Sequence, residues 1–213
     1  MLPLLLLLLA PEGEILEARL EAKVDGSRDV AVRLAYRIER SGADPVRFSA
    51  LQIDGVALEG ISASAAENAL LVSLDPGSGP KLEGLISLPE GATGFELRYL
   101  VRGGALPTED GIRVRLPCAI LDLKTAETRT GLFASEVGVP PGLTVVDGFP
   151  SDTVATADGV VRSEMPLVPA FVSFRASSGA ALLTPSRLAT AAVVALLLAV
   201  GFFGIRRARG VKA

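Results

Sequence analysis

The sequence of 213 residues contains no histidine, no tryptophan and a single cysteine, Cys118. Without histidine, this sequence can form neither a Ser-His-Asp nor a Cys-His catalytic arrangement, and it cannot supply histidine ligands to zinc, copper or haem. One cysteine makes no internal disulfide and holds no iron–sulfur cluster, so we expect a buried free thiol. The aromatic content of 5% also gives little material for a sugar-stacking surface. We therefore predict a non-enzyme with no catalytic residues, no metal site and no cofactor.

Charge is distributed unevenly along the chain. All 24 acidic residues precede Arg187, together with 16 of the 21 basic residues, so residues 1–186 carry a net charge of −8. A protein that binds phosphate backbones needs a basic face. We therefore expect no nucleic-acid partner, and we expect little electrostatic attraction between this acidic part and anionic lipid headgroups.

The C-terminal region contains an uncharged apolar run of eighteen residues from Leu188 to Ile205. At about 1.5 Å per residue a helix of this length spans about 27 Å, which is close to the thickness of the hydrocarbon core of a bilayer. The run predicts one transmembrane helix over residues 187–206 and a basic tail over residues 207–213. By the positive-inside rule the tail lies in the cytoplasm, and the rest of the protein lies in the periplasm or at the cell exterior. The residues that determine this topology are Arg206, Arg207, Arg209 and Lys212.

Three alanines of the predicted helix, Ala191, Ala195 and Ala199, are spaced by four residues. Such spacing places small side chains along one side of a helix and lets a second helix approach closely. The three alanines are therefore candidates for self-association through the membrane helix. Alanine is abundant in this chain, and a coincidental spacing is an equally good explanation.

The N-terminal segment supports export of the protein. The stretch Leu2–Ala10 is apolar, too short to cross a bilayer, and of the length of a signal-peptide core. We predict a signal peptide over residues 1–13, with an open cleavage site because no basic residue precedes the stretch and Pro11 follows it; an N-terminal strand is the alternative. Residues 177–186 form a short linker, which reaches about 33 Å at most when extended.

Residues 14–176 have the patterns of strands. Apolar residues alternate with charged ones from Ile15 to Val24, and a second alternation runs from Val30 to Ile38 after the turn residues Asp25 and Gly26. These two runs predict a long hairpin with one solvated face. Further short runs between turn signals predict an all-β ectodomain, namely an antiparallel β-sandwich of about 10–11 strands with Ig-like general architecture. A split near residues 117–128 into two smaller sandwiches is the alternative.

Three predictions concern individual strands. The alternation over residues 70–74 predicts one strand, and the alternations over residues 95–101 and 112–116 predict hairpin partners across a loop at residues 103–111. Residues 153–161 are also predicted to form one strand. A chain of this length buries enough surface to be stable without disulfides or metal.

The polar faces of these strands carry the candidate binding groups. Glu109 and Asp110 are adjacent carboxylates of the kind that glycosidases pair, but adjacent loop side chains more often point apart into water. Six arginines could line a site for an anionic ligand, although cross-strand pairing with Glu or Asp explains them more simply. These arginines are Arg33, Arg37, Arg98, Arg102, Arg113 and Arg115.

Together these features predict a single-pass membrane protein with a β-sandwich ectodomain. We expect it to act as a protein-binding, scaffolding or accessory subunit of an envelope complex, with the membrane and another protein as its partners. One alternative is a membrane-tethered hydrolase that uses loop carboxylates, which predicts a cleft and a carboxyl of raised pKa. The other is a small-ligand or lipid-binding sandwich with an apolar cavity between its sheets.

Overall fold

The computed structural model describes residues 13–66, 68–75, 80–126, 131–150, 153–155, 159–178 and 193–194. The chain divides into two compact units, Met1–Gly179 and Ala180–Ala213. The described part of the first unit consists of strands and their connections, without a helix, and its sheets are mainly antiparallel. The all-β prediction is therefore confirmed.

The predicted signal peptide and the predicted membrane helix lie outside the described residues, apart from Gly13, which begins the first strand, and the helical pair Val193 and Val194. The same holds for Ala191, Ala195 and Ala199 and for the basic residues of the tail. No helix in the described ranges combines the length and the hydropathy that a membrane crossing requires.

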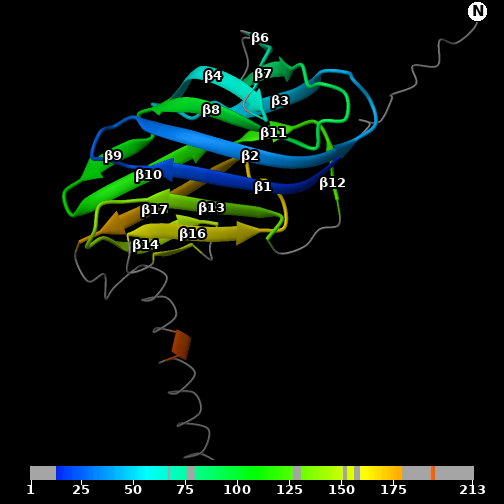
Figure 1. Cartoon of the computed structure of the whole chain (residues 1–213). Helices are drawn as coiled ribbons and strands as arrows, with labels where there is room; N and C mark the ends of the chain where they lie inside the picture. Colours follow the sequence, from blue (N-terminus) through cyan, green and yellow to red (C-terminus); the bar gives the residue numbers. More distant parts are fainter. Residues whose placement is uncertain are drawn as a thin grey trace, which may run out of the picture. The chain divides into compact units, whose positions relative to one another are not determined.

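The strands form three sheets (Figure 1), which we name the large, second and third sheets. The large sheet has the order β15-β16-β13-β1-β2-β8-β4-β5, and β12 also pairs with β1. Its strands are β1 (Gly13–Lys23), β2 (Val30–Arg40), β4 (Ala57–Ala65), β5 (Asn68–Leu70), β8 (Gly94–Arg102), β12 (Lys124–Thr125), β13 (Phe133–Gly138), β15 (Val154–Ala155) and β16 (Val160–Met165).

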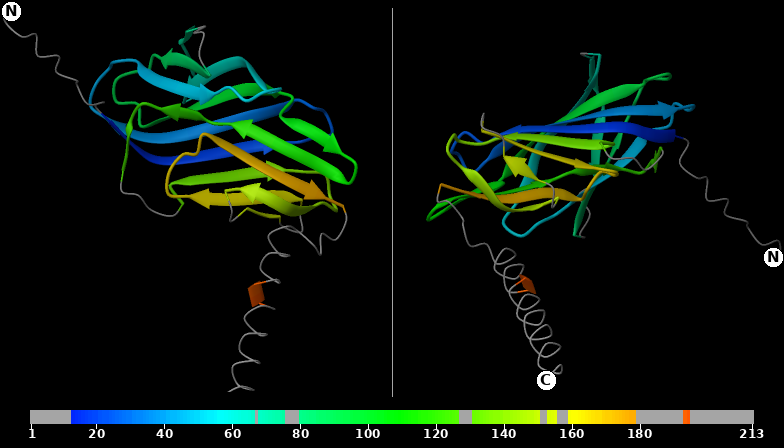
Figure 2. Two further views of the ribbon diagram at one scale, coloured as in Figure 1. Left: turned by 180° about the vertical axis from the view of Figure 1, so that it is seen from behind. Right: turned by 90° about the horizontal axis from the view of Figure 1, so that it is seen from below.

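The two smaller sheets have four strands each among the described residues. The second sheet, in the order β14-β17-β10-β9, contains β9 (Ala105–Thr108), β10 (Gly111–Pro117), β14 (Thr144–Phe149) and β17 (Phe171–Ser177). The third sheet, in the order β11-β3-β7-β6, contains β3 (Val46–Leu51), β6 (Val72–Asp75), β7 (Lys81–Ile86) and β11 (Ala119–Leu121). Seen from behind, the green β10 and the orange β17 lie in front of the large sheet (Figure 2).

The hairpin of β1 and β2 forms as predicted and lies in the middle of the large sheet. Leu20 is opposite Leu34 and both are buried, whereas the neighbouring pair of Glu21 and Arg33 faces outward. This arrangement follows from the alternation of side chains along a strand. On its other edge β1 pairs in parallel with β13, with Leu20 opposite Ser135. The large sheet is therefore mixed, and it joins residues from both sides of the segment 117–128.

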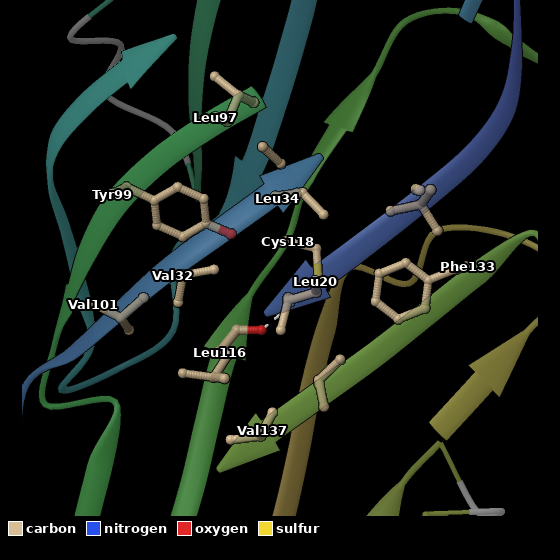
Figure 3. Close-up of a cluster of buried hydrophobic side chains, with 14 of the residues drawn as sticks. Leu20, Val32, Leu34, Leu97, Tyr99, Val101, Leu116, Cys118, Phe133 and Val137 are labelled. Atoms are coloured by element: carbon tan, nitrogen blue, oxygen red, sulfur yellow. Dashed lines mark hydrogen bonds between the residues drawn. The ribbon is translucent and has the colours of Figure 1, made fainter. Parts of the chain in front are cut away.

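The core lies between the large sheet and the β10–β11 segment (Figure 3). Buried side chains of the large sheet, such as Leu20 and Phe133, gather beside Leu116 and Cys118. Two tyrosines connect these layers. The hydroxyl of Tyr99 donates a hydrogen bond to the carbonyl of Pro117 at 2.8 Å, and that of Tyr36 donates to the carbonyl of Ala119.

Burial raises the pKa of both tyrosine phenols and of the Cys118 thiol. A thiol with a raised pKa carries little thiolate and is therefore unreactive. Cys118 is free and buried, as the sequence predicts.

The predicted hairpin between residues 95–101 and 112–116 is wrong. β8 pairs with β2 and β4 in the large sheet, whereas β10 pairs with β9 and β17 in the second sheet. The chain changes sheets after β8 at Gly103, which has a φ of +68° and whose added Cβ would lie 2.3 Å from the carbonyl oxygen of Gly55. Only glycine fits this close approach. The predicted loop therefore contains β9, the true hairpin partner of β10.

Two predicted single strands are also wrong. Residues 70–74 divide at Leu71, which is 73% exposed, because β5 belongs to the large sheet and β6 to the third sheet. Residues 153–161 contain β15 and the start of β16, which pair with each other. The alternation predicts strand conformation in these segments, but it does not record that the chain changes its pairing partner. For this reason the described residues contain three sheets and seventeen strands, more than the sandwich prediction has.

Candidate functional site: a groove across the large sheet

The outer face of the large sheet contains a row of small or apolar residues that crosses five strands. Its members are paired in register, one from each of β16, β13, β1, β2 and β8, and β4 continues the row with Glu59. Lys23 is the one charged residue within the row. The row consists of Val160, Gly138, Lys23, Ala31 and Leu100.

Two open depressions lie along this row. The first, of about 520 Å³, is over Ala31 and Leu100, and the second, of about 680 Å³, is over Gly138 and Val160. Both are bordered by Glu21, Ala22 and Lys23, so they adjoin at β1. We name the two depressions together the cross-strand groove. It forms because short side chains follow one another across the strands while the neighbouring rows carry long charged ones.

The length of the groove follows from the spacing of strands. Neighbouring strands lie about 4.8 Å apart, so the six strands from β16 to β4 extend over about 24 Å. An extended polypeptide advances about 3.3 Å per residue, so about seven residues cover this distance. Figure 1 shows these strands side by side in the large sheet.

One wall of the groove is a network of ion pairs. Arg33 bonds Glu21 at 3.0 Å and Glu96 at 2.5 Å, and Glu96 also accepts a hydrogen bond from Arg98. Further along the same side, Arg162 pairs with Glu136 at 3.3 Å. Arg33 and Arg98 face each other on β2 and β8, and the shared carboxylate of Glu96 offsets their repulsion.

The pKa values reflect this network. Partial burial of Glu96 would raise the pKa of its carboxyl, but hydrogen bonds from Arg98 and Arg33 outweigh it and leave the pKa lowered. The same bond to Glu96, with a second to Glu21, raises the pKa of Arg33. Both shifts favour the charged forms, the carboxylate of Glu96 and the guanidinium of Arg33.

A second ion-pair group lies on the other side of the row, among residues that do not border the two depressions. Arg102 bonds Glu59 at 2.9 Å and Asp29 at 2.6 Å, and Asp29 also accepts the backbone N–H of Gly103 at 3.2 Å. The carboxylates of Glu59 and Asp29 raise the pKa of Arg102. Because the side chain of Arg102 is about half exposed, solvent screens these pairs and they contribute little to stability. These ion pairs hold the charged side chains beside the row in place.

The six arginines singled out in the sequence lie on two different sheets. Arg33, Arg98 and Arg102 form the ion pairs just described, and Arg37 pairs with Glu17 at 3.2 Å. Cross-strand pairing, the simpler interpretation, is confirmed for Arg33, Arg37 and Arg102, whereas Arg98 pairs with Glu96 of its own strand, β8. The other two, Arg113 and Arg115, lie on β10 of the second sheet, and within the described part of the chain they form no ion pair.

Glu109 and Asp110 form the turn between β9 and β10 and are exposed. The carboxylate of Asp110 accepts hydrogen bonds from Nη2 of Arg175 at 2.9 and 3.0 Å, from Ser177 at 2.9 Å and from Thr108 at 3.2 Å. The bonds from Arg175 and Ser177 lower the pKa of Asp110 to about 2. A glycosidase acid needs a raised pKa, so Asp110 is unsuited to that role.

Other carboxyls show the same direction. The backbone N–H and hydroxyl of Ser27 lower the pKa of Asp25, and the pKa of Glu96 is lowered as described above. Among the residues that the structure describes, no group of three or more His, Cys, Asp or Glu side chains is placed to hold a metal ion.

The groove itself is missing from the sequence predictions. Its one local signal is that Ala31 and Leu100 interrupt faces that are otherwise charged. Their alignment with Gly138 and Val160 depends on the pairing of β13 with β1, which joins residues more than 100 positions apart, and on the pairing of β13 with β16.

The fold defines a class of all-β domain with one large mixed sheet and two smaller sheets, and solved structures of similar fold are known. Native leukotriene A4 hydrolase from Saccharomyces cerevisiae matches 78% of this chain with a TM-score of 0.50 and 10% identity. A second structure of the native yeast enzyme matches with a TM-score of 0.52 and 8% identity, and its complex with bestatin with 0.50 and 11%.

This chain covers 28–29% of the length of those hydrolases. At such low identity the likeness shows the fold alone. The sequence matches no family model and no curated protein. The function is therefore argued from the residues of the cross-strand groove.

Proposed function

We propose that the protein is a single-pass, membrane-anchored accessory subunit of an envelope complex whose extracytoplasmic β-sandwich, residues 14–176, binds a partner protein in the cross-strand groove. The observation that supports this most directly is the groove itself. A row of small side chains beside ordered charged ones, on the open face of a wide sheet, provides a long surface for another polypeptide.

The chemistry of the groove favours an extended segment of about seven residues. Ala31, Leu100 and Val160 offer apolar contacts on the floor. The arginines beside the row are already paired with carboxylates, so a partner of high net charge would gain little and would meet groups of both signs. A segment of small apolar residues flanked by polar ones suits these surroundings.

Lys23 adds a specific requirement. It stands in the middle of the groove, borders both depressions, and forms no ion pair among the described residues. Lys23 has an electrostatic interaction with Asp25, two residues further along the chain, and an acidic side chain near the centre of the partner segment would add the direct ion pair that Lys23 lacks among the described residues. We therefore propose an extended segment with a central Asp or Glu as the occupant.

The membrane part of the proposal comes from the sequence. The apolar helix over residues 187–206 would anchor the protein, and the linker over residues 177–186 would keep the ectodomain within about 33 Å of the bilayer. The partner is therefore expected at the same membrane. A short basic cytoplasmic tail suits an accessory subunit better than a signal transducer.

Site-specific photo-crosslinking in native membranes tests the proposal. A benzophenone residue placed at Ala31 should form an adduct with one defined protein. The matched control is Ala35, which lies on the same face of β2 but borders neither depression. An adduct of the same protein at Ala35, or no adduct at Ala31, would contradict binding in the groove.

A variant whose groove is blocked strengthens this test. A Cβ added at Gly138 would have Cγ of Lys23 as its nearest neighbour, at 3.6 Å, which is ordinary contact, so the Cβ of Gly138→Val enters the groove without a clash. This substitution should abolish the adduct at Ala31 while leaving the unfolding transition of the protein unchanged. Persistence of the adduct in the folded variant would place the partner elsewhere.

A further inference from the structure

The outer face of the second sheet contains three arginines close together. Arg113 on β10 is directly opposite Arg175 on β17, and Arg115 is opposite Ser173. Along β10 these arginines alternate with the buried residues Ile112, Val114 and Leu116, so their side chains share the outer face. We name Arg113, Arg115 and Arg175 the arginine cluster.

The charges of the cluster are incompletely compensated. Like charges directly opposite each other destabilise a sheet. Asp110 binds Arg175 at 2.9 Å, and Asp147 on β14 stands opposite Arg175 on its other side. In the described ranges, neither Arg113 nor Arg115 has a carboxylate partner, in contrast to the paired arginines of the large sheet.

A second observation concerns hydrogen-bond donors. The Nε atoms of Arg115 and Arg175 are buried and have no hydrogen-bond partner among the residues that the structure describes. Buried donors without partners are rare because they lose their water without compensation, and a bound ion is one explanation for those that occur. Both atoms belong to the arginine cluster, which places two unsatisfied donors beside two uncompensated charges.

We infer that the arginine cluster binds a phosphate group. A guanidinium presents its N–H donors in a planar fork that matches the oxygens of phosphate. The negative charge of a phosphate would also compensate the positive charges of Arg113 and Arg115. The site is separate from the cross-strand groove and does not depend on the proposed function. The phosphate belongs either to a lipid headgroup or to a small soluble anion.

The first experiment titrates the full chain, in micelles of a neutral detergent, with inorganic phosphate and pyrophosphate. Arginine Nε–H signals are followed by NMR. The signals of Arg115 and Arg175 should shift on binding. In Arg113→Gln/Arg115→Gln the remaining signal should respond with an affinity weakened by about tenfold or more, because charge-assisted hydrogen bonds are lost.

The matched control is Arg33→Gln/Arg37→Gln, which removes the same charge from the large sheet. Its phosphate affinity should equal that of the unmodified chain. Equal weakening in both variants would show a general charge effect and overturn the inference. Tyrosine fluorescence during urea unfolding confirms that each variant is folded.

The second experiment distinguishes the source of the phosphate. Native mass spectrometry of the full chain measures the retention of phosphatidylglycerol and of phosphatidylcholine. Retention of phosphatidylglycerol that is lost in Arg113→Gln/Arg115→Gln assigns the site to anionic lipid. Binding of free phosphate alone assigns it to a soluble anion. If the unmodified chain binds neither anionic lipid nor free phosphate, the proposed site is refuted.

Discussion

The buried pair of serines between β13 and β16 allows a quantitative prediction. Ser135 and Ser163 are directly opposite each other, only 2% and 4% exposed, and their hydroxyl oxygens are 2.6 Å apart. One of the two buried hydroxyls donates this hydrogen bond and the other accepts it. Ser135→Ala removes one partner and leaves the hydroxyl of Ser163 buried without a hydrogen bond, at a cost of about 1–3 kcal/mol in the free energy of unfolding.

The double substitution should behave differently. Ser135→Ala/Ser163→Ala removes both polar groups at once, and replacement of both partners by apolar groups is nearly neutral. The double variant should therefore be more stable than either single variant. The double-mutant cycle should give an interaction free energy of about 1–3 kcal/mol.

Urea unfolding of the full chain in detergent micelles, followed by tyrosine fluorescence, measures these differences. Tyr36 and Tyr99 are the two tyrosines of the sequence and both are buried in the core, and the chain contains no tryptophan. The signal therefore reports on the β-sheet unit. Additive effects, with the double variant destabilised by the sum of the single variants, would refute the reasoning.

Four further predictions use simpler measurements. Gly111→Ala should lower the free energy of unfolding by about 1–3 kcal/mol, because its Cβ would lie 2.0 Å from the carbonyl oxygen of Ala176. In the same urea assay, the control Gly138→Ala should change the free energy of unfolding by less than about 0.5 kcal/mol. The pKa of Asp110 is lowered to about 2 in the folded state. The carboxylate therefore stabilises the fold above its unfolded pKa of about 3.9, and this contribution is lost as the pH falls toward 2. Asp110→Asn should flatten this part of a plot of Tm against pH. The thiol of Cys118 should react with Ellman's reagent only during the urea transition, and reaction of the native protein would contradict its burial. A reporter fused to the C-terminus should be active only in the cytoplasm, and activity on the outer side would exclude the predicted topology.

Local pattern predicts strand conformation well in this chain. The hairpin of β1 and β2 follows from an uninterrupted alternation and a turn whose residues suit it. The alternation is equally clear around Leu71, but there the chain passes from the large to the third sheet without leaving strand-like conformation. Which strands pair therefore depends on packing between segments that are distant in the sequence.

The same limit applies to the candidate sites. Arg33 and Arg113 occupy similar positions on the polar faces of alternating strands. Arg33 lies between Glu21 and Arg98, whereas Arg113 lies between Arg175 and Leu106, and only the pairing of the strands reveals this difference. A compensated network and an uncompensated cluster thus arise from the same sequence pattern.

The central proposal is that the cross-strand groove holds an acidic partner segment. A charge-swap experiment tests this most directly. A peptide that covers the segment crosslinked at Ala31 is titrated into the full chain. Lys23→Glu should weaken binding by at least about tenfold, and replacement of the central acid of the peptide by lysine should restore it. Lys81→Glu, an exposed lysine of the third sheet, should bind as the unmodified chain does. Equal affinity of the Lys23→Glu and Lys81→Glu variants for the original peptide would contradict the proposal.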